Sequence, residues 1–141
     1  EADAWIEVTD AVGIDRTFLV APSSSDARID IVSGATTGFV YAASTMGVTG
    51  TRDTVSDAAP QLVGRVRERT RQPIGVGLGV STAEQAASIA GYADGVIVGS
   101  AFIRRVLDAE SSAEATAEVG RFAAELRQGV GRSAHPPEPD G

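Results

Sequence analysis

Glycines and a serine occur at two points of the sequence where an anion could be bound. Gly77 and Gly79 flank Leu78 in the segment PIGVGLGVS, and Gly99 precedes Ser100 in GVIVGSAF. Glycine leaves backbone N–H groups uncovered, and the N–H groups that begin a helix direct positive charge at an anion without any lysine. One such pair is a weak signal, because glycines also permit tight turns. The two pairs together predict a phosphate site.

The side chains needed for proton transfer are missing from the same positions. The segments that end the four predicted strands, APSSS, ASTMG, GLGVS and GSAF, contain no Asp, Glu, His, Lys or Cys. Proton transfer requires a titratable side chain within hydrogen-bond reach of the substrate. The sequence therefore predicts that this chain binds substrate and contains no catalytic residue. The one histidine, His135, lies in a Pro-rich tail and there is no cysteine, so no metal site is expected.

The segment between the second predicted strand and the next helix has the composition of a mobile lid loop. In TMGVTGT, Gly47 and Gly50 bracket Val48, and hydroxyl residues alternate with them. Glycines placed like hinges predict a lid that closes over a ligand. The alternative is a surface loop without a role.

The elements that position these residues follow from hydrophobic spacing. Short apolar runs predict four strands, at residues 17–21, 38–43, 74–78 and 95–99, and each is followed by a helical pattern. Such alternation indicates an α/β fold with a parallel sheet. An open doubly wound sheet and a barrel both satisfy it. A (β/α)8 barrel is favoured because no strand begins a G-x-G-x-x-G fingerprint and an extra short helix, at about 101–107, follows the last strand. Since a full barrel needs about 250 residues, four βα units are its half.

Helix signals set the expected boundaries. A first helix carrying Trp5, Val8 and Val12 on one face should end at Gly13. Further helices are expected to begin at an N-cap on Ser23 and at capping boxes on Ser81 with Glu84 and Ser111 with Glu114, and Pro60 suits the first turn of another. The last should end near Gly129. Residues 1–129 are thus predicted to form the half-barrel, and residues 130–141 a disordered polar tail.

The composition excludes several classes of partner. The net charge is −7 over 141 residues, with a pI near 4.6 and no cluster of basic residues that a nucleic acid or an anionic membrane would require. No apolar stretch approaches the roughly 20 residues of a membrane span, and no signal peptide is evident. We expect a cytoplasmic protein that binds small molecules and other proteins.

Four longer segments resemble a known family. GFVYAASTMGVTGTR, PIGVGLGVSTAEQA and ADGVIVGSAF closely resemble the sixth, seventh and eighth strands and loops of tryptophan synthase α subunits, and FLVAPSSSDARI resembles the fifth. The likeness covers roughly residues 1 to 128 in the right order. It implies cleavage of indole-3-glycerol phosphate to indole and glyceraldehyde 3-phosphate in tryptophan biosynthesis. It also implies a β subunit as partner in an α2β2 complex, with pyridoxal phosphate bound by that subunit and no cofactor in this chain.

The resemblance also assigns roles to individual residues. It implies that Gly50, Leu78, Gly79, Gly99 and Ser100 bind the phosphate. Thr49 would hold the lid closed by bonding an aspartate, and Tyr41 would line the pocket. The family's catalytic glutamate and aspartate belong to its second strand and following loop, which precede residue 1.

The chain departs from the family pattern at two of these positions. Thr45 stands where many relatives have an arginine, and Leu78 replaces an aromatic residue. Neither change removes a backbone donor.

Two alternatives to this interpretation stay open at this point. One is a different sugar-phosphate barrel enzyme. The other is a non-catalytic phosphate-binding half-barrel that dimerises over its open edges.

Overall fold

The part of the chain that the structure describes forms four strands, each followed by at least one helix, after an initial helix. The fold was obtained as a computed structural model that describes residues 2–44, 57–77 and 79–133. The strands are β1 (Leu19–Val20), β2 (Val40–Ala42), β3 (Ile74–Val76) and β4 (Gly95–Val96). The helices are α1 (Asp3–Val12), α2 (Asp26–Ala35), α3 (Ala58–Arg67), α4 (Ala83–Ala90), α5 (Ser100–Asp108) and α6 (Ser112–Ser133).

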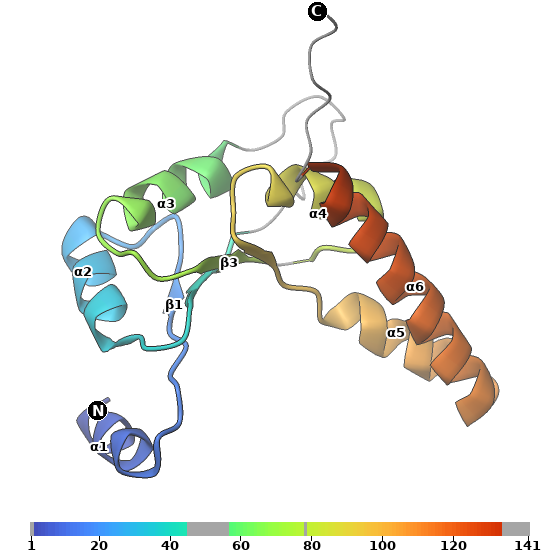
Figure 1. The fold of residues 1–141 in the computed structure, drawn as a ribbon, viewed down its shortest axis with the longest axis horizontal. Helices are drawn as coiled ribbons and strands as arrows, with labels where there is room; N and C mark the ends of the chain where they lie inside the picture. The colour runs from blue at the N-terminus through green and yellow to red at the C-terminus, as the bar shows by residue number, and fades with distance from the viewer. Residues whose placement is uncertain (1, 45–56, 78, 134–141) are drawn as a thin grey trace, which may run out of the picture.

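The sheet is parallel and its strands lie in sequence order, β1-β2-β3-β4. Helices α2, α3 and α4 follow one another around a single side of it (Figure 1). A doubly wound sheet reverses its strand order and carries helices on both faces, whereas a barrel keeps the order and carries them only outside. The predicted half-barrel of four βα units is confirmed.

The core lies between the sheet and these helices. Val40, Ala42, Ile74 and Val76 project from the strands toward the helices and are fully buried. Ile29, Leu62, Val66 and Ile89 cover them from α2, α3 and α4 and are fully or almost fully buried. A strand of a barrel is covered on both faces, which explains the continuous apolar runs.

The opposite, inner face of the sheet is apolar and only partly covered, by side chains such as Phe39 and Ile97 over Gly75. One row across it consists of Leu19, Tyr41, Gly75 and Gly95, which are register partners. Leu19 is 59% exposed. Beside this row, a hollow of about 400 Å³ opens over Gly75 and Gly95, with Phe39 and Ile97 in its wall.

Helix α1 is attached by a buried arginine. Arg16 is 6% exposed and donates to the carbonyl oxygens of Ala35 (3.0 Å) and Ile6 (3.3 Å), to the Thr9 hydroxyl (3.0 Å) and to the Asp10 carboxylate. The helix ends at Gly13 with φ +68°, as predicted for a left-handed cap. Its apolar side chains Trp5, Val8 and Val12 are not buried by this attachment and are each more than half exposed.

Two helix starts differ from the prediction by one or two residues. The N-cap of α2 is Ser25, not Ser23, and the capping box of α4 is formed by Thr82 and Gln85, not by Ser81 and Glu84. The Ser24 hydroxyl instead accepts a bond from the Ala21 N–H (3.0 Å) in the preceding turn. Where several hydroxyl residues stand in a row, the cap is the one whose oxygen faces the N–H three residues ahead.

Helix α6 continues to Ser133, four residues past the expected end at Gly129. A Cβ at Gly129 would lie 2.4 Å from the carbonyl oxygen of Ala83, so this glycine permits the close approach of α4. It marks a contact and not a helix end. The rest of the predicted tail, residues 134–141, lies outside the described residues.

Ion pairs join α2 to α3. Arg65 and Arg69 bind the Asp26 carboxylate at 2.7 and 2.8 Å. The Arg65 hydrogen bond and the charges of both arginines hold the pKa of Asp26 below its usual 3.8, so the carboxylate is ionised and paired at neutral pH.

Candidate phosphate site

Gly77 brings the end of β3 against β4. A Cβ at this position would lie 2.3 Å from the carbonyl oxygen of Ile97, so no other residue fits without moving the strand. The Ile97 N–H meanwhile donates to the Val76 carbonyl at 2.8 Å. The corner after β3 is therefore held next to the corner after β4.

Gly79 turns the chain away from β3 in a conformation that favours glycine. Its φ is +80°, in the left-handed region, and a Cβ there would meet no atom within 4 Å. Backbone geometry, not packing, requires a glycine here. The open space beside it belongs to a pocket of about 390 Å³ whose lining also includes Ser81, Ser100 and Ala101. The structure thus brings Gly79 and Ser100 together, as predicted.

The start of α5 supplies uncommitted N–H groups to this pocket. Gly99 is the N-cap residue, and its carbonyl accepts bonds from the N–H groups of Phe102 (2.9 Å) and Ile103 (3.3 Å). The first N–H groups of a helix have no intrahelical acceptor. Those of Ser100 and Ala101 accordingly donate to no other backbone group among the described residues. An anion in the pocket would find them together with the Ser100 hydroxyl.

Two arginines complete the lining of the pocket, and the sequence analysis did not include them. Arg105 donates to the Ala101 carbonyl at 2.8 Å, and its guanidinium carbon lies 3.4 Å from the centre of the Phe122 ring. The Phe122 ring in turn packs edge to face on Phe102, with ring centres 4.9 Å apart. Arg104 also lines the pocket, and its side chain is exposed. The detectable signal was spacing: Arg104 follows Ser100 by four residues, which places both on one face of a helix.

The other predicted site residues divide into two groups. Tyr41 lies on the inner face of β2, half-buried, and is not among the residues that line this pocket. Leu78, Thr49 and Gly50, together with the rest of the predicted lid, lie outside the described residues. Their roles remain predictions.

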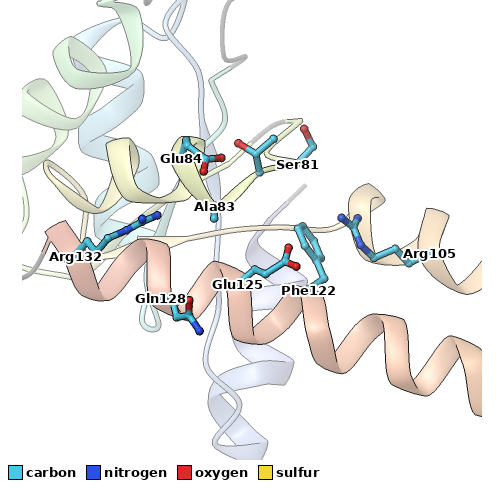
Figure 2. Close-up of a pocket in the computed structure, with 9 residues that line it drawn as sticks. Ser81, Ala83, Glu84, Arg105, Phe122, Glu125, Gln128 and Arg132 are labelled. Atoms are coloured by element: carbon cyan, nitrogen blue, oxygen red, sulfur yellow. The ribbon is translucent and has the colours of Figure 1, made fainter.

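A second pocket lies on the outer side, between the start of α4 and α6. It has a volume of about 380 Å³ and shares Ser81 and Arg105 with the first (Figure 2). Two carboxylates, Glu84 and Glu125, and two guanidinium groups, Arg105 and Arg132, line it. The charges balance, and no phosphate preference follows.

Neither a metal centre nor a membrane span is found in the described part of the chain. No three His, Cys, Asp or Glu residues gather there in a group that would hold a metal ion. None of its helices combines the length and apolar character that crossing a bilayer would need.

Strand order, one-sided helices and a pocket at the carboxyl ends of the strands define the class: half of a (β/α)8 barrel. Comparison with known proteins gives the family. The family model described as "Tryptophan synthase alpha chain" matches residues 1–131, and the chain belongs to this family. The match favours it over the other sugar-phosphate barrels considered above.

Individual relatives agree with this assignment. The tryptophan synthase alpha chain of Acidothermus cellulolyticus is 58% identical over 132 residues, which are 94% of this chain and 49% of that protein. For the alpha chain of Thermobifida fusca the identity is 57%, over 95% of this chain and 51% of the relative. The chain therefore spans about half the length of the curated relatives it matches.

In solved structures, too, this chain matches about half of the other chain. Tryptophan synthase from Mycobacterium tuberculosis superposes with a TM-score of 0.77 at 49% identity, over 92% of this chain and 47% of that chain. The tryptophan synthase α2β2 complex from Pyrococcus furiosus gives a TM-score of 0.77 at 35% identity, over 90% of this chain and 51% of the other.

Proposed function

We propose that this chain is the C-terminal half of a tryptophan synthase α subunit and holds the phosphate of indole-3-glycerol phosphate. The whole subunit would cleave this substrate to indole and glyceraldehyde 3-phosphate, a retro-aldol reaction that breaks a carbon–carbon bond. The observation that carries the proposal is the pocket shared by Gly79 and Ser100, in a chain whose family is tryptophan synthase alpha.

The phosphate would be held mainly by backbone donors. The amides of Ser100 and Ala101 lie at the positive end of the α5 dipole, and the Ser100 hydroxyl lines the same pocket. Gly79 leaves its side of the pocket without a side chain. Leu78 and Gly50 would add donors from neighbouring loops, and Gly99 would hold the start of α5 in place.

The acid and base would come from the other half of the barrel. The described ends of the four strands carry no carboxylate or imidazole, so the proton-transfer groups would be the family's upstream glutamate and aspartate. Thr49 would close the lid over the bound substrate, and Tyr41 would face the reacting end from the inner surface of β2. This chain alone would be inactive.

We further propose that the partner protein is the β subunit of tryptophan synthase. Structural relatives include an α2β2 complex, which supports this pairing. Pyridoxal phosphate would belong to the β subunit, and this chain would need no cofactor. Cytoplasmic localisation remains a prediction from the sequence.

The test is complementation of the two halves. This chain, mixed with a separately produced N-terminal half of a related α subunit, should release indole from indole-3-glycerol phosphate. Each half alone should release none. The matched control is an N-terminal half in which the family's glutamate is replaced by glutamine, which should bind this chain without restoring turnover. Indole release by this chain alone would contradict the proposal.

A further inference from the structure

Two charged side chains, Arg104 and Arg105, belong to the described lining of the phosphate pocket, and they differ in their protein partners. Among the described residues, no ion pair or hydrogen bond is found for the Arg104 side chain. Arg105 next to it is committed to the Ala101 carbonyl and to the Phe122 ring. The described lining residues include no acidic side chain that would neutralise either arginine.

Arg104 lies on the same face of α5 as Ser100. Ser100 and Arg104 are four residues apart in α5, so their side chains lie one above the other on the same face. Side chains in a helix lean toward its N-terminus and cover the preceding turn. In agreement with this direction, Arg104 lines the same pocket as Ser100 and Ala101.

The competing partner on this face is weak. Asp108 follows Arg104 by four residues at the last position of α5, with no ion pair to it. A cation placed N-terminal to an anion at this spacing is the less favourable order. Arg104 is thus available to a ligand.

The negative charge of the proposed ligand exceeds the positive charge that the start of α5 supplies. A phosphate monoester carries about −1.5 to −2 charges at pH 7. The N-terminus of a helix supplies the equivalent of roughly +0.5, and a serine hydroxyl supplies none. Backbone donors alone would leave about 1 to 1.5 negative charges unbalanced in a chain of net charge −7.

We propose that Arg104 pairs with the phosphate dianion of the substrate and makes the pocket selective for a doubly charged phosphate monoester. This inference rests on the proposed function, because it assumes that the pocket at Gly79 and Ser100 binds phosphate. A guanidinium offers two parallel N–H donors to two phosphate oxygens, a geometry that lysine cannot reproduce. Arg104 is a specificity-determining residue in this scheme, and Arg105 part of the wall.

The experiment measures binding of glycerol 3-phosphate to this chain by titration calorimetry, since all the described lining residues belong to it. Arg104→Gln should weaken binding about tenfold, the order of a partly exposed charged hydrogen bond. It should also make the affinity less dependent on salt. Arg104→Lys should keep the salt dependence but not the full affinity. Arg127→Gln is the matched control, an exposed arginine of α6 that lines neither of the two pockets, and should bind as the parent does.

The possible outcomes distinguish a wrong role for Arg104 from a wrong assignment of the phosphate pocket. If Gly79→Asp abolishes binding while Arg104→Gln leaves affinity and salt dependence unchanged, the pocket is right and the role of Arg104 is wrong. If the parent chain binds no glycerol 3-phosphate, or Gly79→Asp still binds it, the pocket itself is wrong. Equal weakening by Arg104→Gln and Arg127→Gln would show a general charge effect and overturn the inference.

Discussion

Two glycines that look equivalent in the sequence act differently at the end of β3. Position 77 requires a glycine because the Ile97 carbonyl would collide with any Cβ. Gly79 has open space around it, and its positive φ is what favours glycine there. The first sets the distance between two strands. The second turns the backbone and leaves the pocket open. Substitutions at Gly79 can therefore test ligand binding without a packing defect.

Asparagine and aspartate at Gly79 form a matched pair for that test. Both tolerate a left-handed backbone better than other residues and have nearly the same shape. Gly79→Asp should lower phosphate affinity by roughly 100-fold, because like charges in contact cost several kcal/mol. Gly79→Asn should retain most of it. Calorimetric titration with glycerol 3-phosphate measures both, and equal losses would show that backbone strain, not charge, causes the effect.

The candidate site was predictable from the sequence in part. Gly79 and Ser100 were paired correctly because successive parallel strands end at the same edge of the sheet. Arg104 and Arg105 were not predicted because they lie a turn inside α5, beyond the strand ends where ligands of parallel sheets bind. Tyr41 was placed on a strand, but only the fold decides which face it occupies.

At the scale of elements, hydrophobic spacing predicted every described strand and helix, and local contacts decided where they end. Thr82, not Ser81, caps α4 because its hydroxyl accepts the Gln85 N–H at 3.2 Å while the Gln85 side chain bonds back. At Gly129 the usual helix-ending residue lies inside α6. The first choice depends on side-chain geometry within one turn and the second on Ala83, a neighbour distant in sequence, and periodicity reveals neither.

The packing of α4 on α6 predicts a stability effect at Gly129. Gly129→Ala should lower the free energy of unfolding by about 1–3 kcal/mol, because the added methyl group collides with the Ala83 carbonyl. Gly120→Ala on the same helix meets no atom within 4 Å and should raise it by about 0.4–1 kcal/mol. Urea unfolding of both variants measures the difference. A stable Gly129→Ala variant would mean that the two helices are further apart.

At the scale of the whole molecule, helices cover the outer face of the sheet, whereas no helix covers the inner face among the described residues. In a closed barrel, layers of side chains from alternate strands fill the interior. The hollow over Gly75 and Gly95 is where side chains from four further strands would fit. β1 and β4 each pair on one side only, which leaves two edges open for the same strands.

The exposed apolar face of α1 has a spectroscopic consequence. Trp5 is the only tryptophan of the chain and is 57% exposed. Its indole ring should emit as a hydrated fluorophore in the isolated chain. On addition of a tryptophan-free N-terminal half, burial against the newly docked strands and helices should move the emission to shorter wavelength. An emission maximum that stays constant while enzymatic turnover appears would show that α1 faces water in the assembled barrel. The chain therefore contains its own optical reporter of assembly, one that needs no added label.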